Sequence, residues 1–216
     1  AMHFATTDPS LATLDTQWLL GSSLLVAPCL TGENETSHNT TDVHLPADSS
    51  WYTFGRNGKD APVQAGPKML HLTDVPLDAI PMYVAGGSIV ALAPHGLQYS
   101  DMLPGGPLQV HIYAGGDAAF TLYEDVGSWR LLSFRLASAP KNKLLAQDGA
   151  SLAYEQNVVR QTTFRWSEKD RELSWAVDGG WKDEHVFLQM QAVLFDPHTT
   201  VRSGVLLLGT GGHHAF

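Results

Sequence analysis

Hydrophobic and polar positions alternate along much of this chain with a period of two residues. Alternation of this kind predicts β-strands that turn one face to a core and the other to solvent. The alternation is clear at residues 42–45 and 69–75. Further strands are expected at residues 51–54, 79–84, 88–92, 108–113, 118–123, 158–166, 172–177, 186–194 and 205–208. Gly, Pro, Asn and Asp lie between them, as is typical of the turns of antiparallel hairpins. The pattern therefore predicts a mainly β fold.

Residues 24–27 depart from the alternation, because four consecutive residues are apolar. Such a run is typical of a parallel strand that is buried on both faces. Pro28 has no amide N–H and would end this strand, and residues 11–20 before it are compatible with a short helix. A parallel strand needs neighbours and covering helices, so we expect residues 1–30 to be the tail of a larger body.

Pro and Gly are concentrated in residues 93–106, which makes this segment the predicted domain boundary. The strands before it predict a first antiparallel sandwich over residues 31–95. The strands after it predict a second sandwich over residues 96–216. In the second, two glycines between residues 113 and 118 suit the tight turn of a hairpin.

Composition narrows the class of protein and of partner. The chain has 216 residues, of which 44% are hydrophobic and 16% charged, as expected for a globular protein. Its formal net charge of −9 disfavours nucleic acid and anionic membrane, because both partners demand clustered Lys and Arg. The sequence has neither an apolar run of membrane-spanning length nor the layout of a signal peptide. We therefore expect no nucleic acid and no membrane among the partners.

Two N-glycosylation acceptors lie in one polar loop. Asn34 is followed by Glu and Thr, and Asn39 is followed by two Thr residues. Glycosylation at these positions would place the protein in the secretory pathway, in the endoplasmic reticulum, a lysosome-like compartment or outside the cell. Chance matches to so short a motif are common, so the sequence leaves both possibilities open.

Cysteine and histidine usage indicates no redox, nucleophilic or metal site. The single cysteine, Cys29, follows the apolar run and is expected to be a small buried hydrophobe. The ten histidines show no metal-binding spacing, and His213 and His214 fall in a segment expected to be a frayed tail together with the glycine-rich residues 209–212. We expect no metal and no cofactor.

Aromatic and acidic residues offer weaker candidates for a site. An aromatic face can stack on the apolar face of a sugar, although sandwiches also need aromatics in their cores, and core packing is the favoured interpretation. The aromatic candidates are Trp51, Tyr52, Trp175 and Trp181. The adjacent acids Glu124 and Asp125 would point to opposite faces of a strand, which favours a structural or capping role over a carboxylate pair.

Several short segments together resemble glycoside hydrolase family 31, the α-glucosidase family. They are DTQWLLG at residues 15–21, LLVAP at 24–28, VHLP at 43–46, WYTF at 51–54, PLDAIP at 76–81, AGGSI at 85–89 and LYED at 122–125. Each is weak alone, but they follow the family's order and spacing over about residues 1–166. The resemblance implies that residues 1–30 end with the last strand of a (β/α)8 catalytic barrel, followed by proximal and distal C-terminal sandwiches.

The resemblance also implies an activity for the parent enzyme, the hydrolysis of α-linked glucosides with retention. Retention requires two carboxyl groups about 5 Å apart, one as nucleophile and one as acid/base. In the family these lie upstream of the matched segments, in a Trp-x-Asp-Met-Asn type motif and a Gly-Asp-Asn type motif. Residues 181–183 match only half of the first, and residues 116–118 fail the second at its third place. We therefore predict no catalytic residue in this chain and no activity of the chain alone.

Residues 126–147 interrupt the family's pattern, which commonly continues from Tyr-Glu-Asp directly into Asp-Gly. The insert holds four of the chain's 13 basic residues and no acid. Its first residue, Val126, and its last, Gln147, have codons that match the usual ends of an intron. A retained intron or a gene-model error is one hypothesis, and a genuine basic surface loop is the other.

The sequence thus predicts the C-terminal part of a retaining α-glucosidase-like glycoside hydrolase, with a structural role beside the barrel. Its partners would be the missing barrel and N-terminal domains of the parent chain, and the parent would act on an α-glucoside or glycan. The alternative is a noncatalytic carbohydrate-binding or docking module. Against it, residues 1–30 would then expose an apolar strand with unpaired edges.

Overall fold

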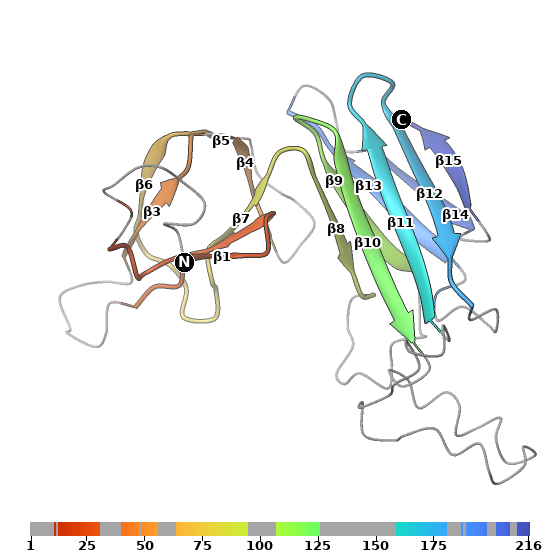
Figure 1. Cartoon of the computed structure of the whole chain (residues 1–216). Coiled ribbons are helices and arrows are strands. Elements are labelled where there is room, and N and C mark those ends of the chain that lie inside the picture. Colours follow the sequence, from red (N-terminus) through yellow and green to blue (C-terminus); the bar gives the residue numbers. More distant parts are fainter. Residues whose placement is uncertain are drawn as a thin grey trace, which may run out of the picture. The chain divides into compact units, whose positions relative to one another are not determined.

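The computed structural model describes residues 11, 13–30, 40–47, 49–55, 64–94, 107–125, 159–180, 187, 189–197, 202–207 and 211–216. These residues form fifteen β-strands and no α-helix (Figure 1). The mainly β class, with antiparallel sheets that match the C-terminal sandwiches of the resemblance, is confirmed.

The chain divides into two compact units, each with its own sheets. The first unit comprises Ala1–Ser88, Ile112–Asp117 and Leu194–Val201, and the second comprises Ile89–His111, Ala118–Val193 and Arg202–Phe216. Two segments that are distant in the sequence therefore complete the first unit.

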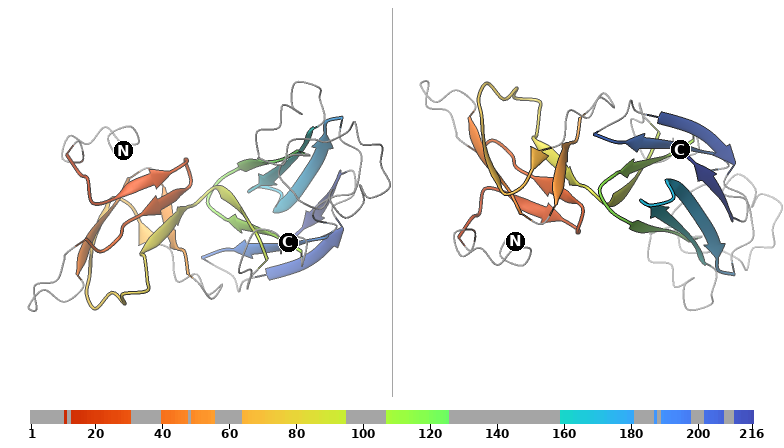
Figure 2. Two further views of the ribbon diagram at one scale, coloured as in Figure 1. Left: turned by 90° about the horizontal axis from the view of Figure 1, so that it is seen from below. Right: turned by 90° about the horizontal axis from the view of Figure 1, so that it is seen from above.

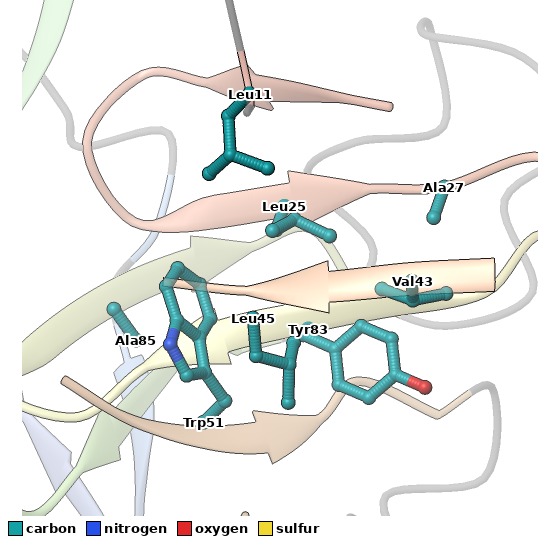
Figure 3. Packing of buried hydrophobic residues seen from close by; sticks show 8 residues of the cluster. All are labelled: Leu11, Leu25, Ala27, Val43, Leu45, Trp51, Tyr83 and Ala85. Atoms are coloured by element: carbon teal, nitrogen blue, oxygen red, sulfur yellow. The ribbon is translucent and has the colours of Figure 1, made fainter. Parts of the chain in front are cut away.

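The first unit contains a five-stranded antiparallel sheet and a two-stranded one. The larger sheet has the order β1-β2-β7-β4-β5 and the smaller one pairs β3 with β6. Their strands are β1 (Trp18–Leu20), β2 (Leu24–Val26), β3 (Thr41–Leu45), β4 (Ser50–Thr53), β5 (Gln64–Ala65), β6 (Lys68–Leu72) and β7 (Met82–Ala85). The core lies where inward side chains of both sheets meet (Figure 3). It consists of Leu11, Leu25, Ala27, Val43, Leu45, Trp51, Tyr83 and Ala85.

Two four-stranded sheets make up most of the second unit, and Figure 2 shows them as separate layers. One has the order β10-β11-β12-β15 and the other the order β14-β13-β9-β8. Their strands are β8 (Ser88–Leu92), β9 (Leu108–Tyr113), β10 (Ala118–Asp125), β11 (Val159–Ser167), β12 (Glu172–Asp178), β13 (Gln189–Phe195), β14 (Arg202–Leu207) and β15 (Gly211–Ala215). Phe164, Trp166, Leu173 and Met190 are among the side chains buried in this unit.

The predicted parallel strand at residues 24–27 is wrong. β2 has β1 on one side and β7 on the other, and both pairings are antiparallel. β1 also occupies part of the segment expected to be helical, and it reaches β2 through a tight turn in which Gly21 has φ of 66°. The apolar run reflects a sheet with apolar residues on both faces, a pattern that does not by itself distinguish parallel from antiparallel pairing.

The predicted frayed tail at residues 209–214 is also wrong over its described part. Gly211–Ala215 forms β15, which pairs antiparallel with β12. The amide of Phe216 donates to the carbonyl oxygen of Arg171 at 2.9 Å, and its ring meets that of Trp166 edge to face at 5.9 Å. Backbone pairing and one aromatic contact therefore order a strand whose own sequence has almost no apolar residue.

Candidate functional site

Three of the four aromatic candidates for sugar stacking are buried. They are Trp51, Tyr52 and Trp175. The Trp51 indole Nε1 donates to the carbonyl oxygen of Pro46 at 3.1 Å, and the Tyr52 hydroxyl donates to that of Ala114 at 2.8 Å. Their faces are closed to a sugar, so the core-packing interpretation is confirmed for these three. Trp181 lies outside the described residues.

Tyr52 belongs to a small aromatic stack within the first unit. Its ring meets that of Tyr113 edge to face at 5.3 Å, and Tyr113 stacks on Phe195 at 4.9 Å with 11° between the ring planes. The amide of Ala114 donates to the carbonyl oxygen of Phe195 at 3.0 Å. The stack connects β4 to Ile112–Asp117 and Leu194–Val201, the later segments of the first unit. The sequence alone does not predict that these segments lie next to β4.

Glu124 forms a buried ion pair with Arg160, its register partner on the neighbouring strand. The two side chains are 5% and 2% exposed. Arg160 Nε donates to Glu124 Oε2 at 3.0 Å, and its Nη2 donates to Oε1 at 3.3 Å. The carboxylate is thus engaged on both oxygens and shielded from solvent, which fits the structural role expected for Glu124. The side chain of Asp125 lies outside the described residues.

Sequence reasoning did not single out Arg160, although a signal for it exists. Arg160 and Thr162 have the same parity along β11 as the buried Phe164 and Trp166, so all four point inward. An inward arginine requires an acidic partner, and the only Glu in the preceding strand is Glu124. The hydroxyl of Thr162 is fully buried and has no hydrogen-bond partner in the part of the chain that the structure describes.

The remaining polar candidates take part in local structure. Cys29 is partly exposed rather than buried, and its thiol donates to the carbonyl oxygen of Thr40 at 3.3 Å. Asp117 follows the turn between β9 and β10, where Gly115 has φ of 130°. His213 Nδ1 lies 3.5 Å from Glu172 Oε1 across the β12–β15 pair.

Among the titratable groups that the structure describes, Tyr83 has a shifted pKa with a clear physical cause. Tyr83 is almost completely buried in the core of the first unit (Figure 3). Burial disfavours the charged phenolate and raises the pKa of the Tyr83 phenol above its ordinary value.

Other predictions fall where the structure gives no description. Both glycosylation acceptors, Asn34 and Asn39, and the whole insert at residues 126–147 lie outside the described residues. Among the described residues, no group of three or more His, Cys, Asp or Glu could hold a metal ion. No helix within the described ranges is long and apolar enough to cross a membrane.

Residues 1–90 match the profile of the glycosyl hydrolase family 31 C-terminal domain. Among solved structures, the family 31 α-xylosidase from Xanthomonas citri is similar over 100% of this chain and 21% of its own, with 23% identity and a TM-score of 0.68. The family 31 dextranase from Flavobacterium johnsoniae, complexed with glucose, matches 88% of this chain and 20% of its own, with 25% identity and a TM-score of 0.62.

The endoplasmic reticulum glucosidase II complex, a heterodimer of a catalytic subunit and the binding domain of a regulatory subunit, is also similar. It matches 83% of this chain and 17% of its own, with 18% identity and a TM-score of 0.55. The chain therefore spans about a fifth of the length of these structures. Residues 1–90 are thus similar to the family 31 C-terminal domain, and the chain has the fold of the C-terminal portion of family 31 enzymes, as the sequence resemblance predicts.

Proposed function

We propose that this chain is the structural C-terminal part of a retaining α-glucosidase-like glycoside hydrolase. The observation that carries the proposal is the profile match over residues 1–90, in a chain that spans only about a fifth of each solved relative. Its role is to support the catalytic barrel and N-terminal domains of a parent protein. The predicted division into 1–30, 31–95 and 96–216 belongs to this proposal, although β1 and β2 of the first part lie in one sheet with β7, β4 and β5 of the second.

The parent hydrolyses O-glycosyl bonds in α-glucosides, and the isolated chain hydrolyses nothing. A retaining enzyme needs two carboxyl groups that flank the scissile bond, and both aspartate motifs of the family are missing from this sequence. The buried Glu124, paired with Arg160, cannot take either role while it is shielded from solvent.

Two measurements test the proposal. The purified chain should give no turnover of p-nitrophenyl α-glucoside or α-xyloside above that of a mock purification, whereas turnover that co-purifies with the chain would overturn the claim of inactivity. Sequencing of the transcript from the source should show a reading frame that continues upstream through both aspartate motifs. A frame that opens near Met2 would overturn the assignment to a parent hydrolase.

The same transcript decides the origin of residues 126–147. We propose that they are a retained intron or a gene-model error, so the mature transcript should lack their codons. A tryptic peptide from within the segment, found in protein from the native source, would establish the basic surface loop instead.

We also propose that Asn34 and Asn39 carry glycans and that the parent passes through the secretory pathway. Native protein should then lose mass on treatment with peptide N-glycosidase, with conversion of both asparagines to aspartate. Unmodified Asn34 and Asn39 in the native protein would remove the support for this localisation.

The second candidate function is a noncatalytic carbohydrate-binding module, and one exposed aromatic residue favours it. Tyr123 is 45% exposed on the outward face of β10, in register with Gln161 of β11, which is in register with Asp178 of β12. Thr121 and Thr163 form the next row, so an aromatic ring lies among amide, carboxylate and hydroxyl groups that suit a sugar.

Affinity electrophoresis in gels that contain a soluble α-glucan tests this second function. Retardation of the chain that Tyr123→Ala removes, and that Met69→Ala leaves intact, would establish binding at this face. Migration that is unchanged by the glucan would exclude it for that polymer.

A further inference from the structure

The five-stranded sheet of the first unit is apolar on its outer face as well as on its core face. The outer face is defined here as the side chains that alternate with those of the core. Trp18, Val26 and Met82 form one row across β1, β2 and β7, and Leu20, Leu24, Val84 and Tyr52 form the next row across β1, β2, β7 and β4. The register thus brings seven apolar or aromatic residues together with no charged one.

The two ends of this outer face differ in how far they are covered. At the β4–β7 end, Val84 and Tyr52 are buried, and Tyr52 contacts Tyr113 and Ala114 of the same unit. At the β1 end, Trp18 is 40% exposed and Leu20 is 61% exposed.

The exposed end is also a sheet edge. β1 is the terminal strand of the sheet, so in the part of the chain described one side of its backbone has no partner strand. β1 has only three residues, so its backbone edge is short, but two of its three side chains are large, apolar and exposed. Clustered exposed apolar side chains are usually covered in stable proteins. β3 and β6 already cover the core face of the sheet. A further binding partner would therefore contact the outer face.

We propose that the outer face at β1 and β2, centred on Trp18 and Leu20, is the surface on which the remainder of a family 31 parent docks. This inference rests on the proposed function. The whole face lies within residues 1–90, the span of the family domain, and each solved relative that contains this fold continues into a body about four times as large as the matched part. An uncharged apolar face requires an apolar partner surface, and the absent body is the partner that the comparisons supply.

Thiol labelling tests the docking surface without requiring activity. In a Cys29→Ser background, which removes the only cysteine and keeps a donor toward the Thr40 carbonyl, Leu20→Cys places a thiol on the outer face. Met69→Cys is the matched control, because Met69 is 60% exposed. It directly precedes the inward Leu70 on β6, so the two side chains point to opposite faces of that strand. The reactivity of each thiol toward a maleimide is measured on the peptide that contains it, by mass spectrometry, in the 216-residue chain and in the full-length product of the source transcript.

We expect the thiol at position 20 to react at least about tenfold more slowly in the full-length protein than in the chain, because docking removes its exposure. The thiol at position 69 should react within about twofold of the same rate in both. Equal rates at position 20 in a parent that contains the barrel would overturn the docking surface and leave the proposed function standing. Protection at position 20 that grows with concentration of the chain alone would show a second copy as the occupant, which also overturns it.

A transcript that lacks the barrel would instead overturn the proposed function, and this inference with it. The two failures are therefore distinguished by the sequencing result, which is obtained before any labelling is done.

Discussion

Glu124 and Arg160 show how a single pair of residues constrains the second unit. Both side chains point inward from neighbouring strands at a register position where apolar residues would otherwise lie. An isolated charge in such surroundings is unfavourable, whereas two opposite charges with two hydrogen bonds satisfy each other. Removal of one partner would therefore cost more stability than the intact pair contributes, because it would leave the other charge buried and uncompensated.

Glu124→Gln should lower the free energy of unfolding by about 3–5 kcal/mol, because the change leaves the Arg160 charge buried and uncompensated. Glu172→Gln is the matched control in the same sheet, where the glutamate is 40% exposed and its partner His213 is 77% exposed. The control should cost no more than about 1 kcal/mol. Urea unfolding of both variants measures the difference, and similar losses in the two would show that the buried pair is not electrostatically important.

Tyr83 gives the first unit a predictable response to alkaline pH. Because burial raises the pKa of its phenol, the folded chain keeps this proton at pH values where the unfolded chain releases it. The unfolded state then binds fewer protons, so stability falls as the pH rises above about 10, by at most about 1.4 kcal/mol per pH unit from this group. In Tyr83→Phe that contribution is absent, so the stability advantage of the unsubstituted chain over the variant should shrink between pH 9 and pH 11. A constant difference would contradict the assignment.

At the scale of elements, strands with an alternating pattern were predictable and two other segments were not. Segments 158–166 and 172–177 correspond to β11 and β12 to within one residue at each end, because one buried face produces a period of two. β2 was given the wrong pairing, since its apolar run reflects two apolar faces and carries no information on strand direction. β15, with the sequence GGHHA, has no apolar period at all and exists through its pairing with β12.

The candidate site was predictable to a similar extent. Core packing of Trp51, Tyr52 and Trp175 followed from the need of a sandwich for large apolar side chains. The uncovered outer face could not be recognised while β2 was expected to be parallel, because the neighbours of Trp18 and Leu20 depend on the register with β2.

Gly212 shows what β15 requires of its sequence. A Cβ atom at this position would lie 2.6 Å from Cζ2 and 2.9 Å from Cη2 of the Trp175 ring, which is buried. Gly212→Ala should therefore cost about 1–3 kcal/mol as the ring or the strand shifts. Amide hydrogen exchange should show the loss of protection concentrated in β15. Gly116→Ala is the control, because its Cβ would have its nearest neighbour at 3.8 Å, and equal exchange in the two variants would contradict the steric argument.

At the scale of the whole molecule, the two units are not consecutive in the sequence. Ile112–Asp117 and Leu194–Val201 belong to the first unit although they follow the predicted boundary at residues 93–106. Hydrogen bonds within that unit connect the parts on either side of the boundary. The Gly87 amide donates to the Tyr113 carbonyl oxygen at 2.8 Å, and the Tyr52 hydroxyl donates to the Ala114 carbonyl oxygen at 2.8 Å. The predicted boundaries at 30 and 95 stay a prediction, and a cut in the chain is the direct way to examine them.

A chain cleaved at a protease site introduced within residues 96–106 should remain associated under native conditions. The N-terminal piece retains Tyr52 and β8, while the C-terminal piece retains Tyr113, Phe195 and the strands with which β8 forms a sheet. Separation would expose the Tyr52–Tyr113 contact and leave β8 without its neighbours, and burial of one aromatic side chain alone contributes roughly 1.5–3 kcal/mol. Gel filtration should therefore show co-elution in buffer and two separate species in urea, with Tyr113→Ala lowering the urea concentration at which the pieces part. Two pieces that separate in buffer, each with a cooperative unfolding transition, would instead establish residues 31–95 and 96–216 as independent domains.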